Sequence, residues 1–433
     1  MLVAEGRDIF AAPDGLPTNP GTRQQPVDLP TALSSNSPAS AGDTIWLRGG
    51  TYPGNFVSAL AGSETRPIFV RQVPGEQATI MAVALDEPAL TVDGTWTWFR
   101  DFVVTLAPPA QRRPLEADEL DLRQSGGIVV RGTHIALVNL VVHDVPRGIE
   151  VAAGAGRTLI AGNIVYHAGW RDSPRGTGIH TTAGSGDQYV VGNVVFGQGG
   201  AGIAVNMNDS DRLLLEGNAS FDNGVAGEYF DRNIVVEGGT MRVVGNYTYY
   251  RPGRRGGENN FGYGVGCRHI SAEANYWAHG ESYPVNLSKC DGDVTGNTFI
   301  GNVDPAILSR YPGNTHLQPP YRGLQTFVVP NRYDSDRATV VVYNWDRHSA
   351  VNLDVTAAGL APGTSFEIRD ALNYFAAPVV TGVYGEGKIN VPLAGLEEAD
   401  LTGTLTTTLG HTAPEFLAFV LIKTATDSGA RAR

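Results

Sequence analysis

The sequence is poor in charge and in cysteine, and each shortage excludes a class of protein. Charged residues make up only 18% of the 433 residues, which argues against long amphipathic helices. The net charge is −12, so we expect no nucleic-acid partner. Two cysteines, Cys267 and Cys290, are too few for a disulfide framework. Because no run of about 18 apolar residues occurs, we also expect no membrane span.

Glycine and apolar residues are plentiful, and they point to strands joined by turns. The chain contains 54 glycines, and 42% of its residues are hydrophobic. It is also too long for one ordinary compact core, which favours two domains or one elongated repeat. This composition predicts an all-β protein that can bury a sizeable core.

An asparagine recurs at one fixed phase of a repeat through the middle of the chain. Short β-rich stretches flank each copy on both sides. The copies are Asn139, Asn163, Asn193, Asn218, Asn246, Asn275 and Asn297, at steps of 24, 30, 25, 28, 29 and 22 residues. A third apolar stretch follows in most units, beginning at Gly148, Gly178, Gly202, Asn233, Gly264 and Pro284. Three short strands per unit of roughly 25 residues are typical of one coil of a parallel β-helix.

The recurring asparagine has two physical reasons to occupy a bend between strands. Asparagine tolerates a left-handed backbone, and its amide can bond the asparagines of the coils above and below. The alternative interpretation is a β-sandwich with regularly spaced strands. Recurrence at one phase favours the β-helix, and the uneven steps place the variable loops just before the third strand.

The N-terminal region resembles the opening of secreted β-helix polysaccharide lyases. The residues that carry the resemblance are FAAPDG from Phe10, NPGT from Asn19, and AGDTIWLRGGTYPG from Ala41. Pectate lyase-like and chondroitinase B/alginate lyase-like enzymes begin in this way. The resemblance implies a right-handed parallel β-helix and secretion. The central coils lack the lyases' catalytic pattern of lysine and arginine, so no catalytic residue is carried over; the only lysines are Lys289, Lys388 and Lys423.

Four segments are expected along the chain. Residues 1–40 form an N-terminal segment and cap, and residues 41–310 form the catalytic β-helix. A linker, residues 311–323, precedes a small antiparallel β-sandwich over 324–433, where alternating strands are separated by turn signals. The last segment resembles the accessory β-domain that ends many secreted carbohydrate-active proteins.

Two rows of side chains leave the core when the coils are aligned on the asparagine. Four residues after it stand His143, His167, Gly197, Asp222, Tyr250, His279 and Gly301. On the outer side of the third strand, alternation predicts Glu150, His180, Ala204, Val235, Gly266 and Asn286. The long loops fall between the two rows, so we expect them to wall a cleft centred on His180.

Carboxylates, arginines, histidines and aromatic residues gather in this predicted cleft, which suits a sugar polymer. A catalytic role is predicted for His180, Glu228, Asp231, Glu258 and Asp172. Substrate binding is predicted for Glu150, His167, Trp170, Arg171, Arg175, Asp222, Tyr229, Arg232 and Arg254. Arginine binds acidic groups bidentately, and carboxylates serve as acid and base or hold a Ca²⁺ ion against a uronate. No metal ligand is assigned, and Ca²⁺ is the only cofactor considered.

These residues favour a carbohydrate-active enzyme that cleaves the glycosidic bonds of a polysaccharide or oligosaccharide, with a uronate lyase ahead of other activities. An inverting glycoside hydrolase with paired carboxylates is the alternative, because lysine is scarce. Others are a non-catalytic polysaccharide-binding protein and a uronate epimerase. We expect a secreted or periplasmic protein, although no signal peptide is visible in this chain.

The two cysteines are expected to face each other on adjacent coils. Cys267 lies 8 residues before Asn275, and Cys290 lies 7 residues before Asn297. Neighbouring strands are separated by a distance that a disulfide accepts. The spacing therefore predicts a bond in an oxidising compartment, whereas two buried thiols are the alternative.

Overall fold

The chain divides into two compact units. The computed structural model describes residues 6–84, 86–107, 126–170, 176–184, 186–226, 232–252, 256, 258–278, 283–287, 289–403, 405 and 407–424. The first unit is Met1–His316 with Leu401–Thr408, and the second is Leu317–Asp400 with Leu409–Arg433. No sequence pattern predicts the return of Leu401–Thr408 to the first unit, and the four expected segments stay a prediction.

Three parallel sheets make up the first unit across the described residues. Sheet 1 holds β1 Asp8–Ala11, β2 Thr44–Leu47, β5 Ile68–Gln72, β8 Thr97–Arg100, β11 Ile135–Val138, β14 Thr158–Ala161, β17 Gln188–Val191, β20 Arg212–Glu216, β23 Thr240–Val244, β26 His269–Glu273 and β29 Gly292–Thr295. Sheet 2 holds β3 Gly50–Pro53, β6 Ala78–Ala82, β9 Val103–Leu106, β12 Val141–His143, β15 Ile164–Tyr166, β18 Val194–Phe196, β21 Ala219–Phe221, β24 Tyr247–Tyr249, β27 Tyr276–Ala278, β30 Thr298–Ile300 and β31 Thr315–Leu317. Sheet 3 holds β4 Phe56–Ser58, β7 Leu90–Val92, β10 Gly126–Val130, β13 Arg147–Val151, β16 Ile179–Thr181, β19 Ile203–Asn206, β22 Arg232–Glu237, β25 Glu258–Phe261 and β28 Val285–Asn286.

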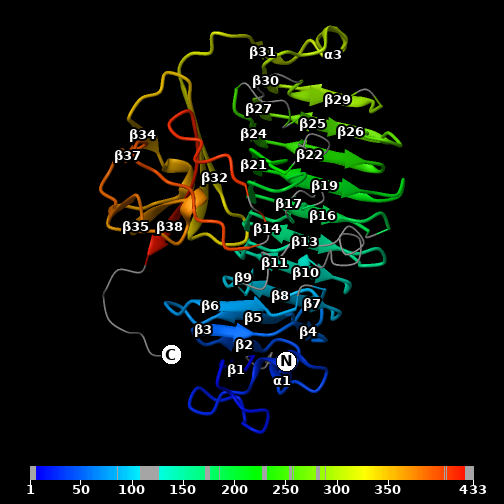
Figure 1. The fold of residues 1–433 in the computed structure, drawn as a ribbon, viewed down its shortest axis with the longest axis vertical. Helices are drawn as coiled ribbons and strands as arrows, with labels where there is room; N and C mark the ends of the chain where they lie inside the picture. The colour runs from blue at the N-terminus through cyan, green and yellow to red at the C-terminus, as the bar shows by residue number, and fades with distance from the viewer. Residues whose placement is uncertain are drawn as a thin grey trace. The chain divides into compact units, whose positions relative to one another are not determined.

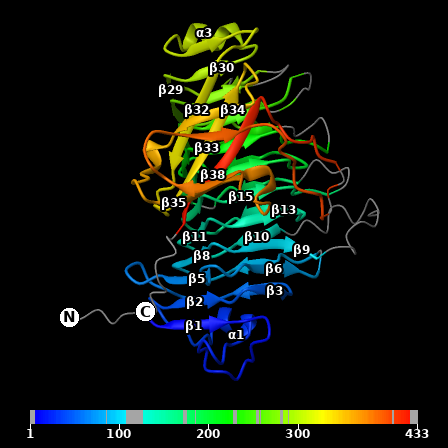
Figure 2. The same ribbon diagram turned by 90° about the vertical axis from the view of Figure 1, so that its left-hand side faces the viewer.

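Each coil contributes one strand to each sheet, and this confirms the predicted parallel β-helix. The strands of a sheet stack along the unit in chain order (Figure 1). The turned view shows β1, β2, β5, β8 and β11 following one another in the same way (Figure 2). Every pairing within these sheets that has a determined register is parallel, as between β13, β16 and β19.

Alternation along the strands fills the interior of the helix with stacked apolar side chains. In sheet 3, Ile149 pairs in register with Ile179, and the row continues through Ile203 and Ile234. All four are at most 1% exposed. Burying one such side chain contributes roughly 1.5–3 kcal/mol, so stacking the coils is what stabilises each of them.

The asparagines form a buried ladder at the corner between sheets 1 and 2. Asn218 Oδ1 accepts from the backbone N–H and from Nδ2 of Asn193, at 3.0 and 2.9 Å. Asn218 Nδ2 in turn donates to Asn246 Oδ1 and to the carbonyl of Val190. The same pattern runs from Asn163 to Asn297 and ends at Asn314. The predicted bonding between coils is confirmed.

The second reason given for these asparagines is wrong for most of them. The left-handed backbone belongs to the residue before the asparagine, which is glycine in most coils, as at Gly192 and Gly217 with φ of 64° and 66°. Ala274 takes this place in one coil, with φ of 55°. Only Asn139 is itself left-handed, with φ of 56°. The glycine makes the bend, because it has no Cβ, and the asparagine provides the hydrogen bonds.

One coil is out of phase with its predicted alignment. Its third strand is β25, so Glu258, Asn259 and Asn260 lie in a strand rather than in a loop. Asn260, not Gly266, pairs with Val235 on the outer row, and Gly266 lies in the turn that follows. Arg147 and Arg232 also lie in strands of sheet 3, β13 and β22.

Cys267 and Cys290 form the predicted disulfide between neighbouring coils. Their Cα atoms are 5.0 Å apart, and 23 residues separate them in sequence. The bond joins the turn that follows β25 to the turn that precedes β29. It therefore links two coils near the C-terminal end of the helix.

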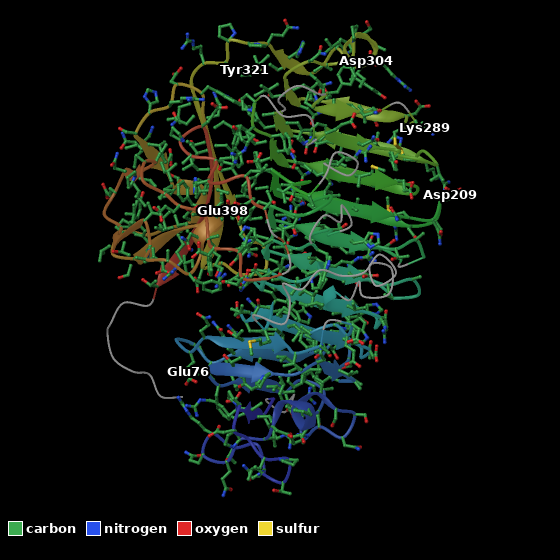
Figure 3. The ribbon with its side chains drawn as sticks, in the orientation of Figure 1. Glu76, Asp209, Lys289, Asp304, Tyr321 and Glu398 are labelled. Atoms are coloured by element: carbon green, nitrogen blue, oxygen red, sulfur yellow. A yellow bond between two sulfur atoms is a disulfide. The ribbon has the colours of Figure 1, made fainter. Side chains whose placement is uncertain are left out.

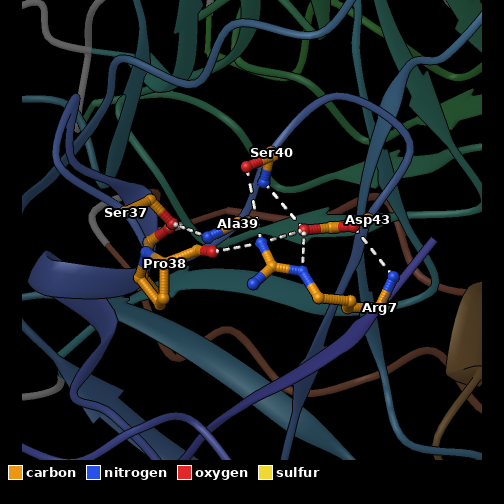
Figure 4. A network of polar contacts seen from close by, with 7 residues as sticks. Arg7, Ser37, Pro38, Ala39, Ser40 and Asp43 are labelled. Carbon is orange, nitrogen blue, oxygen red and sulfur yellow. Dashed lines mark hydrogen bonds and ion pairs between the residues drawn. The ribbon is translucent and has the colours of Figure 1, made fainter.

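An ion-paired network closes the N-terminal end of the helix (Figure 4). The Arg7 guanidinium and its backbone N–H donate to the carboxylate of Asp43, and Ser40 N–H donates to the same group. Burial raises the pKa of Asp43, but these hydrogen bonds outweigh it, and the pKa lies below its usual value. Asp43 stands in the AGDT motif at the start of the chain, so this part of the motif has a structural role.

A buried carboxylate fixes the returning segment Leu401–Thr408. Asp144 Oδ1 accepts from the backbone N–H groups of Thr402 and Gly403, at 2.9 and 2.8 Å. His143 Nδ1 lies 2.8 Å from Asp144 Oδ2. Burial alone would raise the pKa of Asp144, but His143, His167 and Gly403 together hold it below the usual value. Asp144 is therefore an anion that helps to hold this segment within the first unit.

The second unit is antiparallel, as predicted. Its larger sheet has the order β32 Leu324–Pro330, β33 Arg337–Asn344, β38 Phe416–Thr424, β35 Ser365–Asp370 and β36 Val380–Val383. A second sheet pairs β34 Ala350–Asp354 with β37 Lys388–Pro392. Side chains from both sheets share one core, for example Val340, Leu353 and Phe419.

Helices are short throughout the described residues. They are α1 Leu29–Leu33 and α3 Pro305–Arg310, with 3₁₀ turns η2 Thr356–Ala358 and η3 Ala371–Asn373. None of the helices in these ranges is long and apolar enough to cross a membrane.

Candidate active site

The outward row of sheet 3 forms the floor of the candidate site. Register pairs Glu150 with His180, His180 with Ala204, and Ala204 with Val235. Neighbouring strands lie about 4.8 Å apart, so the row places a different side chain at each step along the helix. The predicted neighbours Glu150 and His180 therefore do lie side by side.

A hollow of about 380 Å³ opens over this floor. Two alanines line the hollow: Ala204 in β19, and Ala201 just before this strand. Ala204 lies between the larger side chains of His180 and Val235 on the neighbouring coils. The hollow therefore arises because this coil has short side chains where the neighbouring coils have longer ones. The polar residues around the hollow are Arg147, Thr177, His180, Asn206, Arg232, Glu237 and Tyr263.

His180 lies beside an ion pair of the neighbouring strand β13. Arg147 Nη1 is 3.2 Å from Glu150 Oε2, and both side chains are partly exposed. Burial lowers the pKa of His180, the negative charge of Glu150 raises it, and the positive charge of Arg147 lowers it. The net pKa lies below the ordinary value of 6.5. The imidazole is therefore neutral at pH 7 and can accept a proton.

Arg232 lies on the opposite side of the hollow. Its Nε is buried and makes no hydrogen bond within the described part of the chain. The nearest carboxylate, Glu258 Oε2, is 3.7 Å from this nitrogen. The guanidinium also lies over the ring of Tyr263, 4.7 Å from its centre. Arg232 is thus held by two neighbours and places a positive charge on the lining of the hollow.

Several predicted site residues lie outside the described residues. They are Arg171, Asp172, Arg175, Glu228, Tyr229, Asp231 and Arg254. Their predicted roles stay predictions. Of the predicted residues that are described, His180 and Arg232 line the hollow. Glu150 and Glu258 do not line it, but they lie next to Arg147 and Arg232, which do.

Three other predicted ligands are buried away from the hollow. The side chain of His167 is 0% exposed and packs edge-on against Tyr166 of sheet 2. Asp222 is bound by the guanidinium of Arg251, at 2.9 and 2.6 Å. Trp170 is 7% exposed. Among the described members of the row that follows the asparagines by four residues, only His143 is partly exposed and the others are buried, so the prediction that this row leaves the core is wrong for them. His167, Asp222 and Trp170 are therefore not part of the site proposed below.

Asn206, Glu237 and Tyr263 were missed as site residues. Asn206 and Glu237 pair with each other two residues beyond Ala204 and Val235, so the same alternation points to them. Tyr263 is 43% exposed and lies in a glycine-rich turn after β25. No sequence signal marks it, because the phase of that coil was misassigned.

No group of three or more His, Cys, Asp or Glu residues that could hold a metal ion occurs among the described residues.

Solved structures with this fold include two carbohydrate-active enzymes. A pectate lyase aligns with 93% of this chain and 97% of its own, at 14% identity and a TM-score of 0.52. A lacto-N-biosidase from Eubacterium ramulus aligns with 72% of this chain and 67% of its own, at 15% identity and a TM-score of 0.50. At these identities the likeness establishes the β-helix fold alone. No protein-family model and no curated protein matches the sequence.

Proposed function

We propose that the chain is a secreted polysaccharide lyase that cleaves a uronate-containing polymer by β-elimination in the hollow over Ala201 and Ala204. The observation that carries the proposal is a neutral histidine between two arginines, on the open face of a parallel sheet. An elimination of this kind needs a base for the proton next to the carboxyl group and a cation that neutralises the carboxylate. His180 and the arginines are groups of these types.

The two arginines suit a polymer that carries repeated acidic groups. Arg147 is on β13 and Arg232 is on β22, three strands farther along sheet 3. At about 4.8 Å per strand they stand roughly 14 Å apart along the helix. Each guanidinium can bind the carboxylate of a different sugar unit when the polymer lies along the helix axis.

His180 is the base in the proposed reaction. Its neutral imidazole takes the proton from the carbon next to the carboxyl group, and the electron pair left behind forms a carbon–carbon double bond as the bond to the leaving oxygen breaks. The imidazolium or a water molecule returns a proton to that oxygen. An arginine beside the carboxylate stabilises the negative charge that develops there.

The described carboxylates do not suit the hydrolase alternative. Glycosidases hold their two carboxyl groups about 5–9.5 Å apart. Glu150 and Glu237 lie three strands apart, roughly 14 Å. Glu237 and Glu258 are on neighbouring strands but at opposite ends of them, since Glu258 pairs with Arg232. A hydrolase would therefore depend on Asp172, Glu228 or Asp231.

Secretion is part of the proposal, because a disulfide such as Cys267–Cys290 persists in oxidising compartments.

The test is incubation with a panel of uronate polymers, with neutral polysaccharides as controls. A lyase leaves an unsaturated sugar, so we expect ultraviolet-absorbing products from at least one uronate polymer and from no neutral one. Reducing ends without this absorbance would overturn the proposal in favour of hydrolysis. Binding without any product would favour a non-catalytic role.

A further inference from the structure

A second hollow lies beside the last strand of sheet 3. Its volume is about 310 Å³, and it lies between β28 and helix α3. Six of its lining residues are Tyr283, Asn286, Asp304, Ile307, Arg310 and Tyr311. Figure 3 labels Asp304 near the end of the first unit where its last coils lie. None of the sequence patterns marks this region as a binding site.

The second hollow continues the line of the first. The outward row runs from Val235 to Asn260 and then to Asn286, which lines the second hollow. From β19, at the centre of the first hollow, to β28 there are three strand spacings, or roughly 14 Å. A polymer lying along this row would therefore reach both hollows.

The side chains of the second hollow have the chemistry of a sugar site. Tyr283 is 41% exposed, which leaves aromatic surface for stacking. The Arg310 guanidinium lies over the ring of Tyr311, 5.3 Å from its centre, and also pairs with Asp291. Asp304 is fixed by capping α3 through the N–H of Ala306. An apolar face next to oriented polar groups matches a pyranose ring with its hydroxyl groups.

We infer that this hollow is a distal subsite, which binds a sugar unit of the same polymer several units away from the bond that is cleaved. The inference rests on the proposed function, because it assigns the hollow to the same substrate. It also identifies the preferred substrate as a long chain, since only a long chain occupies both hollows at once. Binding energy at the distal subsite then favours long chains over short ones.

The experiment compares Tyr283→Ala with the wild-type enzyme on a ladder of oligosaccharides of increasing length. Because Tyr283 lies far from His180, we expect kcat to be unchanged at every length. The KM should rise roughly fivefold for chains long enough to reach the second hollow, as when an aromatic anchor is truncated, and should be unchanged for shorter chains. Phe375→Ala is the matched control, because Phe375 is also 41% exposed but belongs to the second unit.

Failure of this inference can be told apart from failure of the proposed function. If Tyr283→Ala changes KM equally at all lengths, or at none, the distal subsite is refuted while elimination at His180 stands. If the wild-type enzyme yields no unsaturated product, the proposed function fails. Retardation in gels that contain each polysaccharide then decides about the subsite: weaker retardation of Tyr283→Ala supports it, and equal retardation overturns it.

Discussion

The asparagine corner and the face of sheet 3 belong to the same coils but have opposite designs. At the corner, each coil repeats the residue of its neighbour, and each amide finds its partner in an identical amide. On the face, the residue changes at each step, from Glu150 to His180 to Ala204. Repetition satisfies buried polar groups and stabilises the stack, whereas variation produces a hollow with a specific set of charges. The comparison predicts that substitutions at the corner lower the stability and leave the activity unchanged, whereas substitutions on the face lower the activity and leave the stability unchanged.

The largest expected effect is on the face. Replacing His180 with Asn removes the proposed base, so we expect kcat to fall by about 10²–10⁴-fold on the substrate identified from the panel. The free energy of unfolding should change by less than about 1 kcal/mol, because the side chain is on the outer face of sheet 3 and not in the apolar core. His269→Asn, a 45% exposed histidine of sheet 1, is the control and should keep its turnover. Full activity of His180→Asn would place the base elsewhere.

The reverse pattern is expected at the corner. Asn218→Ala removes four hydrogen bonds and leaves the N–H of Asn193 and the carbonyl of Val190 buried without these partners. We expect the free energy of unfolding to fall by about 3 kcal/mol, measured by urea denaturation, with kcat unchanged at a temperature where the variant is folded. Asn208→Ala is the control: Asn208 is exposed, so this substitution should change the free energy of unfolding by less than about 0.5 kcal/mol. Equal stability of the two variants would contradict a supporting role for the ladder.

Substrate binding should depend on the second arginine of the hollow. Arg232→Gln keeps a polar side chain but removes the charge, so we expect KM to rise about tenfold with a smaller change in kcat. Arg212→Gln is the control: Arg212 also pairs with a carboxylate, that of Asp187, but its side chain is 74% exposed on sheet 1. If the two variants have the same KM, Arg232 does not contact the substrate.

A smaller effect is expected where one coil departs from the pattern of the corner. Ala274 has a left-handed backbone at the place where other coils have glycine, and this costs an L-residue about 1–2 kcal/mol. Ala274→Gly should therefore raise the free energy of unfolding by up to about 1 kcal/mol, after the entropic cost of glycine. Gly217→Ala, at the equivalent bend, should lower it by a similar amount. A loss of stability in Ala274→Gly would show that its methyl group contributes more than the strain.

The smallest effect concerns pH. The base must be neutral, and the pKa of His180 lies below 6.5, so the acidic limb of kcat/KM should have its midpoint below pH 6.5. The Arg147 charge lowers this pKa, so in Arg147→Gln the midpoint should move to higher pH. Arg157→Gln, where the arginine lies over Tyr189 on sheet 1, should leave the midpoint unchanged. If the midpoint of the acidic limb is the same in Arg147→Gln and in the wild-type enzyme, a group other than His180 is responsible for that limb.

The sequence predicts the corner better than the face, and the reason is physical. A repeated asparagine is visible because every coil needs the same hydrogen bonds. It correctly aligns five of the six predicted strands of sheet 3 and misplaces the strand of one coil. There the strand Glu258–Phe261 was taken for a loop, because the inward side chain is Asn259 rather than an apolar residue. Asn259 is 0% exposed and donates to Thr248 and to the carbonyl of Pro284, partners that only the folded chain provides.

The hollow itself was beyond what the sequence could predict. His180 and Glu150 were found by alternation, but the space between the charged groups comes from Ala201 and Ala204, which carry no chemical signal. His167 and Asp222 were expected to leave the core, but both are buried, where His167 packs against Tyr166 and Asp222 is bound by Arg251. Whether a polar residue faces a cavity or a partner depends on neighbours that are distant in sequence.

The hydrogen bond that Gly403 N–H donates to Asp144 means that the first unit, although its synthesis begins first, is completed only after most of the second unit has been made. The two residues are 259 positions apart, so at about 5–20 residues per second the ribosome needs roughly 13–52 s to supply this partner. During that time the coil around Asp144 lacks the two N–H donors of its buried carboxylate. Nascent chains that end before residue 402 should therefore leave this coil open to proteases, and synthesis of a few more residues should close it.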